Sequence, residues 1–217
     1  MRILVFDTET TGLPERGCSI YDYERWPHIV QLSFILYDTH AEKALAIHDY
    51  IIRIPSDIDI SKESTMIHGI TNTMCKRKGI PIELAMEEFN EYLEKCDMVV
   101  GHNIDFDKKM IIVESLRNKL KNSFISYGQA KSLYCTMKTS VILCAIQKTN
   151  KDGKDYFKYP SLTELYMKLF DEEPKNTHNS MADVLICLRC YMKIKHNTDI
   201  LKTTDNVLKK VYKQQCC

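Results

Sequence analysis

Residues 5–13 read VFDTETTGL, and this stretch decides the fold. It continues the apolar run that begins at Ile3, so residues 2–7 are predicted to form a buried strand that ends in acid. Asp7 and Glu9 stand two residues apart, and their carboxylates therefore project from one face of that strand, with about 6.5–7 Å between their Cα atoms. A hard divalent cation would offset both their repulsion and their desolvation. Taken alone, the pattern more often describes two acids at a strand end that face water.

A second acidic segment, VVGHNIDFDKKMI, occupies residues 99–111. It predicts a strand that ends at Gly101 and then a helix. Asp107 falls near the N-terminus of that helix, where the helix dipole favours an ionised carboxylate that is ready to bind a metal ion. The alternative is that these acids only cap the helix, and for Asp105 capping is the better interpretation.

The third segment, THNSMADVLICL at residues 177–188, places His178 and Asp183 five positions apart. On one continuous helix this spacing would turn the two side chains about 140° away from each other, so they could not serve one site. We therefore place His178 in the loop before the helix, with Ser180 as the N-cap. Because Ser180 and Asp183 also form a capping-box pattern, a purely structural role for Asp183 stays open.

The rest of the chain predicts an α/β fold, a mixed sheet with helices packed on it. Runs of strand length stand at 29–37, 46–54 and 98–101, and helical patterns at 82–95, 107–120, 161–170 and 180–195. Residues 147–159 have the composition of a solvated loop. We assign residues 1–197 to one domain and 198–217 to a basic, helical tail that docks either on the body or on a partner.

Composition excludes several classes of protein. The chain has 217 residues with 30 Lys and Arg against 29 Asp and Glu, so a net charge of +1 gives no overall field that attracts nucleic acid. Nine cysteines without a signal-peptide pattern predict an intracellular protein, cytoplasmic or nuclear, with reduced thiols. No apolar stretch reaches the roughly 18 residues that span a bilayer. Cys187 and Cys190 are predicted to be core thiols of a helix, because no second ligand pair stands at zinc-finger spacing.

Taken in order, the three acidic segments resemble the His variant of the DEDD superfamily of 3'-5' exonucleases, which includes proofreading-type enzymes. FDTETTGL at 6–13 is similar to the first motif, HNIDFD at 102–107 to the second and HNSMAD at 178–183 to the third. The resemblance covers roughly residues 1–195. It implies a ribonuclease H-like fold with a mixed five-stranded sheet flanked by helices, and it makes residues 1–197 an exonuclease domain.

The resemblance also implies a mechanism. Asp7, Glu9 and Asp183 would hold one divalent cation, Asp7 and Asp107 would reach a second, and His178 would take the proton from the attacking water. Two cations about 3.5–4 Å apart stabilise the attacking and leaving oxygens of an in-line displacement. A neutral imidazole of ordinary pKa, about 6.5, can complete the deprotonation. Mg²⁺ or Mn²⁺ is expected, because the ligand atoms are carboxylate oxygens.

Several residues are expected to contact the substrate. By resemblance, the last base would pack against Leu13 and the terminal sugar would meet Thr10, while Asn103 would support Asp107 or the wall of the site. The full set of expected substrate contacts is Thr10, Thr11, Leu13, Asn103 and His178. Further candidates for nucleic-acid contacts are Lys76, Arg77, Lys78, Tyr23 and Trp26. The alternatives are that the basic cluster is only solvated and that the aromatic residues pack their loop onto the body.

The predicted function is therefore metal-dependent 3'-5' exonuclease activity, on DNA more than on RNA, in proofreading or repair. The partner would be a single-stranded or frayed 3' end, with a polymerase or another protein as a candidate partner and no membrane. A 3'-5' exoribonuclease is the first alternative, since no motif encodes a contact to the 2'-hydroxyl. A phosphatase of the haloacid-dehalogenase kind would need Asp at position 9 and leaves His178 without a role. A non-catalytic nucleic-acid-binding module is the last alternative, although all five catalytic positions are present.

Overall fold

Five strands form the central sheet of the computed structural model, which describes residues 1–126 and 129–216. The strands lie in the order β3-β2-β1-β4-β7. They are β1 (Arg2–Thr10), β2 (Ile29–Asp38), β3 (Lys43–Ile51), β4 (Met98–Gly101) and β7 (Ser132–Cys135). The pairs among β1, β2 and β3 are antiparallel, and β4 is parallel to both β1 and β7. The mixed five-stranded sheet is thus confirmed.

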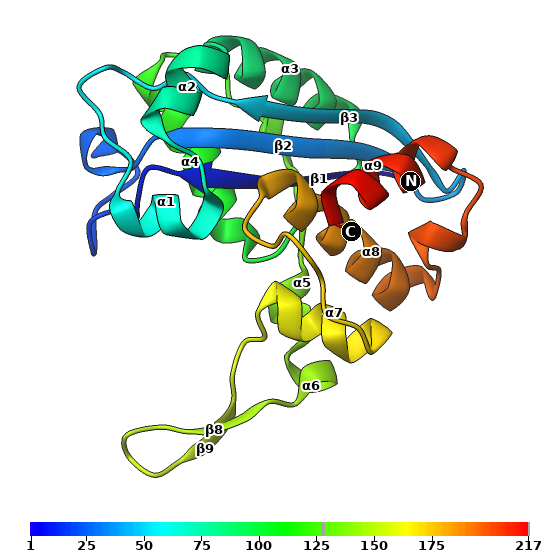
Figure 1. Ribbon diagram of the computed structural model, residues 1–217. Helices are drawn as coiled ribbons and strands as arrows, with labels where there is room; N and C mark the ends of the chain where they lie inside the picture. Colours follow the sequence, from blue (N-terminus) through cyan, green and yellow to red (C-terminus); the bar gives the residue numbers. More distant parts are fainter. Residues whose placement is uncertain (127–128, 217) are drawn as a thin grey trace.

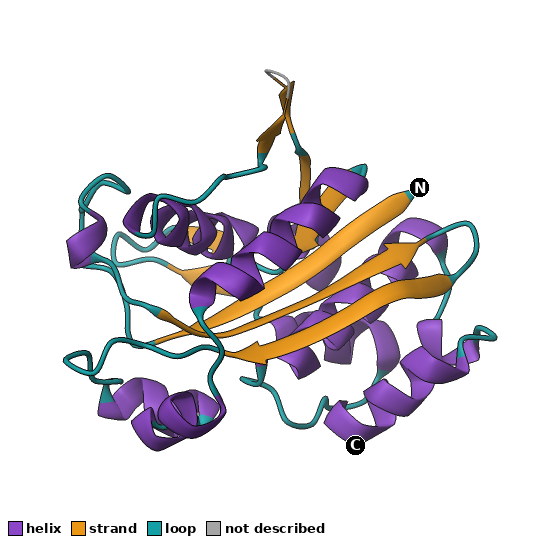
Figure 2. Cartoon of the chain, turned by 90° about the horizontal axis from the view of Figure 1, so that it is seen from above, coloured by secondary structure: helices purple, strands orange, loops and turns teal. Residues whose placement is uncertain are grey.

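Helices cover both faces of the sheet (Figure 1, Figure 2). One layer holds α3 (Ile82–Lys95) and α4 (Ile104–Arg117), and the other holds α7 (Leu162–Phe170), α8 (Ser180–His196) and α9 (Asn206–Cys216). Alternation along β1 divides its side chains between the layers. Leu4 and Phe6 pack with α3 and α4, whereas Ile3 and Val5 pack with α8.

Short elements complete the chain. They are η1 (Tyr23–Arg25), α1 (Lys62–His68), α2 (Asn72–Lys78), α5 (Thr136–Thr139), α6 (Val141–Cys144), η2 (Ile200–Lys202), the antiparallel pair of β5 (Ile125–Ser126) and β6 (Gln129–Ala130), and the hairpin of β8 (Gln147–Thr149) and β9 (Asp155–Phe157). Within the described ranges, no helix is both long and apolar enough to cross a membrane. Cys187 and Cys190 are buried thiols of α8, as predicted.

Two boundaries differ from the prediction in a way that matters for the site. β1 runs on to Thr10 instead of ending at Asp7, because β2 continues to pair with it over that length. α4 begins at Ile104 rather than at Asp107, so Asp107 lies inside the first turn instead of opening the helix.

The prediction of a loop at residues 147–159 was wrong, because the segment contains the β8–β9 hairpin. Asn150 begins its turn: the Asn150 carbonyl accepts from Gly153 N at 3.1 Å, and its side-chain Oδ1 accepts from Lys154 N at 2.9 Å. Gly153 has φ +75°, a left-handed conformation that glycine adopts without steric cost. The hairpin extends away from the sheet and its helices (Figure 1).

The predicted tail forms α9 and docks on the body. Tyr212 and Cys216 are buried, and the Tyr212 hydroxyl lies 2.8 Å from that of Tyr166 in α7. Just before α9, the Asp205 carboxylate accepts a hydrogen bond of 2.7 Å from the backbone N–H of Ala44 in β3. Of the two alternatives for the tail, docking on the body is therefore the one observed.

The aromatic loop at residues 14–28 is also held to the body. The Trp26 side chain is 7% exposed, and its indole N–H donates to the carbonyl of Ser19 at 2.9 Å. Arg117 of α4 donates to the carbonyls of Tyr23 at 2.7 Å and of Trp26 at 3.0 Å, and Tyr23 is half-buried. The base-stacking role predicted for Trp26 is therefore wrong, because its ring is already buried in the core.

Candidate active site

The acidic end of β1 lies where the sheet stops pairing on one side. β4 pairs with β1 only as far as Val5, whereas β2 pairs with it as far as Thr10. Asp7 and Glu9 continue the face of β1 that packs against α8. Carboxylates thus replace apolar side chains on one face of one strand, at the position where β4 no longer covers its edge.

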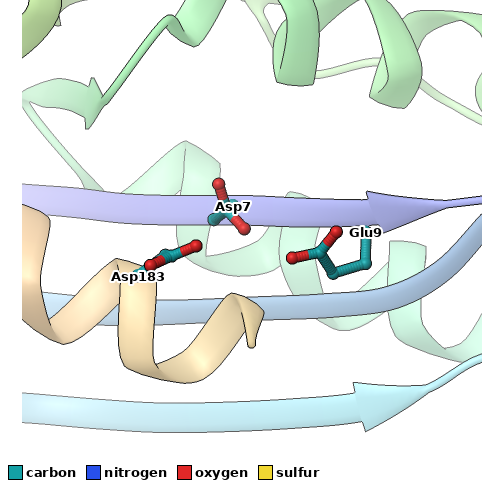
Figure 3. A group of neighbouring side chains, drawn as sticks. All are labelled: Asp7, Glu9 and Asp183. Atoms are coloured by element: carbon teal, nitrogen blue, oxygen red, sulfur yellow. The ribbon is translucent and has the colours of Figure 1, made fainter. Parts of the chain in front are cut away.

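Asp183 reaches this face from the first turn of α8. One carboxylate oxygen from each of Asp7, Glu9 and Asp183 lies within 4.8 Å of the others (Figure 3). Over the part of the chain that the structure describes, this is the one group of three or more potential metal ligands that lie so close together. Oxygen ligands of this kind suit hard divalent cations, so the residues present fit the cation that the sequence predicts.

The N-terminus of α8 is attached to the sheet by Ser180. The N-cap is Asn179, not the predicted Ser180, and the Asn179 side chain accepts from the backbone of the first turn. The Ser180 hydroxyl instead donates to the Asp7 carbonyl at 2.7 Å, and Ser180 N donates to Oε1 of Gln31 in β2 at 3.2 Å. Gln31 is a positioning residue that the sequence analysis missed, since its partner lies 149 residues away.

His178 lies in the loop before α8, as predicted, with an exposed side chain. Its backbone N–H donates to Oδ2 of Asp183 at 3.1 Å. The capping-box alternative for Asp183 is therefore wrong, because the carboxylate holds the His178 loop rather than Ser180. His178 has φ 68°, a left-handed conformation that is uncommon for a residue other than glycine and that occurs often at functional sites.

Asp107 is buried and is held by Thr8, which the sequence analysis also missed. Oδ1 of Asp107 accepts from Thr8 N at 3.1 Å and from the Thr8 hydroxyl at 2.7 Å. This Thr8 N–H lies beyond the last pair of β4 with β1, so the carboxylate takes the place of a strand neighbour. Asn103, expected to support Asp107, is exposed at the N-cap of α4. Asp105 makes no cap either and forms an ion pair with Lys138.

Burial raises the pKa of all four acids, and repulsion by neighbouring carboxylates adds to it for Asp7, Glu9 and Asp183. Burial is the largest cause for Asp7, whose pKa rises well above its usual range, and the charges of Asp107, Asp183 and Glu9 add to it. The pKa of Glu9 rises to about 8, chiefly through burial and then through Asp183. Burial raises the pKa values of Asp107 and Asp183 to about 7. Four anions are thus disfavoured at neutral pH, and a divalent cation among them would remove the repulsion.

A groove of about 530 Å³ opens beside the acids, between the end of β1 and α1. Leu13 lines it and is 85% exposed, so its side chain is free to pack against a ligand. Thr10 lines the groove too, and its hydroxyl donates to the carbonyl of Gly12 at 2.7 Å. The Thr11 hydroxyl is turned inward, where it accepts from His28 N at 3.0 Å, and the groove lining does not include it.

His68 forms part of the groove wall. Its Nδ1 accepts from Ile70 N at 3.0 Å, which leaves Nε2 to donate to the Thr10 carbonyl at 3.2 Å. Burial lowers the pKa of His68, in agreement with this neutral form. The basic cluster 76–78 forms the exposed last turn of α2 and does not line this groove, so its contact with nucleic acid stays a prediction.

The sequence pattern of the exonuclease family known as RNase T matches residues 4–191. The chain belongs to this exonuclease family. The matched range contains all three acidic segments, and the resemblance to the DEDD superfamily is confirmed. A search of curated proteins gave no match to this chain.

Solved structures of exonuclease I share the fold of this chain. The E. coli enzyme in complex with a dT13 oligonucleotide has a TM-score of 0.63 and 19% identity, over 90% of this chain and 42% of that chain. A product-bound exonuclease I has a TM-score of 0.66 and 18% identity, over 90% and 44% of the two chains. The zinc-bound form of the E. coli complex with single-stranded DNA has a TM-score of 0.66 and 16% identity, over 98% and 42%.

These TM-scores establish a common ribonuclease H-like fold. The chain spans less than half the length of the exonuclease I chains that it matches. Family and fold thus agree that residues 4–191 form an exonuclease-family domain.

Proposed function

We propose that this exonuclease is a metal-dependent 3'-5' exonuclease that releases nucleoside monophosphates from a single-stranded or frayed 3' end, preferring DNA to RNA. The observation that carries the proposal is the carboxylate cluster, in which Asp7, Glu9 and Asp183 lie within 4.8 Å of one another. The buried carboxylate of Asp107 is the charged neighbour that most raises the pKa of Asp7, which supports a shared cation between these two acids.

The four acids would divide between two divalent cations, Mg²⁺ or Mn²⁺. Asp7, Glu9 and Asp183 would hold one, and Asp7 with Asp107 would hold the other. Such cations, when bound, would supply the positive charge that stabilises the attacking and leaving oxygens of the phosphodiester. Thr8 engages Oδ1 of Asp107 with two hydrogen bonds, so Oδ2 is the oxygen left for the cation.

His178 would take the proton from the attacking water and pass it to solvent. Its loop is tied to the cluster by the hydrogen bond from its backbone to Asp183, while the imidazole stays exposed. That position suits a base that must meet a water molecule at the cluster and then release a proton. The exposed side chain of Leu13 would pack against the last base, in the groove that Thr10 also lines.

The preference for DNA is supported by the structural neighbours. Of the three exonuclease I structures described above, two hold DNA, one as a dT13 oligonucleotide and one as single-stranded DNA. An exoribonuclease remains the second candidate, because no motif in this chain encodes a contact to the 2'-hydroxyl of RNA.

The direct test is a time course with Mg²⁺ on matched single-stranded DNA, single-stranded RNA and duplex DNA with a mismatched end, each labelled at the 5' end. A ladder that shortens from the 3' end supports the proposal, and the order of rates selects DNA or RNA. Release of the labelled 5' nucleotide first, or internal cuts, would contradict the polarity. Full activity with a chelator present would contradict the role of the cations.

Matched variants test the roles of single residues. Glu9→Gln and His178→Gln should each stop nucleotide release in a folded protein. Their controls are Glu87→Gln and His40→Gln, which make the same changes at exposed positions outside the cluster. Near-normal activity in His178→Gln would remove His178 as the base and leave the acidic cluster as the proposed centre.

A further inference from the structure

The β8–β9 hairpin exposes aromatic rings that have no role in the core. Every residue from 147 to 157 is exposed, and the hairpin stands away from the body (Figure 1). Tyr156 is 49% exposed, Phe157 47% and Tyr159 59%. These three rings, with Lys138, Val141 and Lys158, line a groove of about 590 Å³ at the base of the hairpin. A solvent-facing group of rings in a groove is typical of a binding surface.

The charge of the hairpin favours a polyanion as the ligand. Residues 147–158 contain four lysines and two aspartates, a net charge of +2, whereas the whole chain carries +1. One of the aspartates, Asp155, accepts hydrogen bonds from Gln147 at 2.9 Å and from Thr149 at 2.7 Å. Lys148, Lys151 and Lys154 have no ion-pair partner among the described residues. Their charges are therefore available to phosphates.

One face of the hairpin places Lys148 beside Tyr156, whereas Phe157 lies on the other face, across from Gln147. Lys148 pairs across the strands with Tyr156, so both side chains project from the same face, opposite to the face of Thr149 and Asp155. A single-stranded nucleic acid offers bases that stack on rings and phosphates that attract ammonium groups, the combination that this face presents.

The base of the hairpin contacts elements that neighbour those carrying the acids. Lys158 at its base donates to both carboxylate oxygens of Glu164 in α7 at 2.6 Å. His102, which directly follows β4, lies with Nε2 3.1 Å from the Pro160 carbonyl, just after the hairpin. Lys138 in the groove forms its ion pair with Asp105, two residues before Asp107. These contacts tie the groove to α7, to the residue after β4 and to the first turn of α4.

We propose that the β8–β9 hairpin is a docking surface for the single strand whose 3' end is cut, with Tyr156, Phe157 and Tyr159 stacking on bases and Lys148, Lys151 and Lys154 binding phosphates. This inference rests on the proposed function, since it gives the same substrate a second point of contact. It makes long strands better substrates than short ones, because only a strand that spans both places binds the hairpin and the cluster together.

The test measures binding without cutting, as the fluorescence anisotropy of a labelled single-stranded DNA of about 20 nucleotides with a chelator present. Tyr156→Ala should weaken binding at least about fivefold, the smallest effect expected from the loss of one stacked base, while Tyr156→Phe keeps the ring and should bind like the parent protein. Tyr156 is exposed, so both proteins should melt at the parent temperature.

The salt dependence of binding tests the lysines of the hairpin. The double variant Lys148→Gln with Lys154→Gln should lower the slope of log affinity against log salt by about 0.7 for each lost phosphate contact. The control is the double variant Lys43→Gln with Lys210→Gln, which removes two exposed lysines of β3 and α9. Its slope of log affinity against log salt should change less than that of the hairpin variant. Parent affinity and parent slope in all the hairpin variants would overturn the docking surface.

A second measurement separates the two proposals. The ratio of kcat/KM for the long strand to kcat/KM for a dinucleotide should fall in the hairpin variants with Mg²⁺ present. If the parent protein binds the strand through the hairpin but cuts nothing with Mg²⁺ or Mn²⁺, the docking surface stands and the proposed function fails. If cutting is normal and the ratio does not change, the proposed function stands and the docking surface fails.

Discussion

The two halves of β1 belong to one strand, yet they act on stability in opposite directions. Residues 3–6 are buried between both helix layers, and residues 3–5 pair with β4 as well as β2. Residues 7–10 lose β4 as a neighbour and carry two carboxylates with raised pKa values. The first half stabilises the fold by apolar burial, and the second half concentrates charge that the fold disfavours. The candidate site is thus where the core ends, and it lowers the stability of the metal-free protein.

Asp7→Asn should show the largest effect on the acidic half. Loss of this carboxylate should lower kcat by at least about 10²–10³-fold, as when one charge-stabilising group leaves an active site. The metal-free variant should also melt at a higher temperature than the parent, because one repelling anion is gone. Rate assays and thermal melts of the variant and of Asp57→Asn, an exposed control, measure both changes. Near-full activity would contradict the site.

Leu4→Ala tests the apolar half, with the opposite sign for stability. Leu4 is fully buried, so truncation should lower the free energy of unfolding by about 2–5 kcal/mol through lost burial and the cavity left behind. Denaturant titration measures this free energy. Leu13→Ala makes the same change at an exposed position and should stay within about 0.5 kcal/mol of the parent. Equal losses in the two variants would show that burial does not distinguish these leucines.

Thr8→Val tests the boundary between the two halves. Valine keeps the shape of threonine and its backbone N–H but removes the hydroxyl that donates to Asp107. Affinity for Mg²⁺, measured by calorimetry, should fall about 10- to 100-fold, since groups that orient a metal ligand have effects of this size. Thr8→Ser keeps the hydroxyl and should lie closer to the parent. Unchanged affinity in the valine variant would show that the backbone N–H alone holds Asp107.

The pH dependence of stability should be the smallest effect, a change of a few degrees in melting temperature. A carboxyl whose pKa is raised binds its proton more tightly in the folded state, so the metal-free protein should lose stability as pH rises. The window runs from the ordinary pKa, about 4, to the values of about 7 for Asp107 and Asp183 and about 8 for Glu9.

The half-buried histidines His28 and His102 act in the opposite direction, because their pKa values are lowered to about 4 and the stability that they contribute is lost as pH falls from about 6.5. The informative quantity is therefore the melting temperature with Mg²⁺ minus that without, which should grow between pH 4 and 8 as protons leave the acids. A flat difference would show that the four carboxyls are not the groups that bind the cation.

Local patterns in the sequence predicted much of the fold and the order of the motifs. Period-two alternation correctly predicted that Asp7 and Glu9 share one face of a strand. The five-residue spacing from Asp183 correctly predicted that His178 lies outside the helix. Both predictions succeeded because they depend only on neighbouring residues. The prediction of the N-cap of α8 was wrong because it depends on a contact with a distant residue. Ser180 and Asn179 are both good caps, and only a contact with the Asp7 carbonyl takes the Ser180 hydroxyl away.

Contacts between distant residues account for the other failures. Thr8 meets a carboxylate 99 positions away, so no local signal identified it as the support of Asp107. Trp26 is buried because Arg117 of α4 holds its loop. The hairpin had a local signal, since the Asp-Gly pair before Lys154 is typical of a tight turn, but the many charged residues around it suggested a plain loop.

The docking of α9 sets an order of events during synthesis of the chain. Asn176, in the loop that leads to His178, donates a hydrogen bond of 2.8 Å to the carbonyl of Gln215 in the last turn of α9. The ribosome makes the strands and all four acids before it makes residues 206–216, because synthesis runs from the N-terminus. The N-terminal part of the chain can therefore begin to fold first. A growing chain therefore contains its four acids before the loop that carries His178 gains this support.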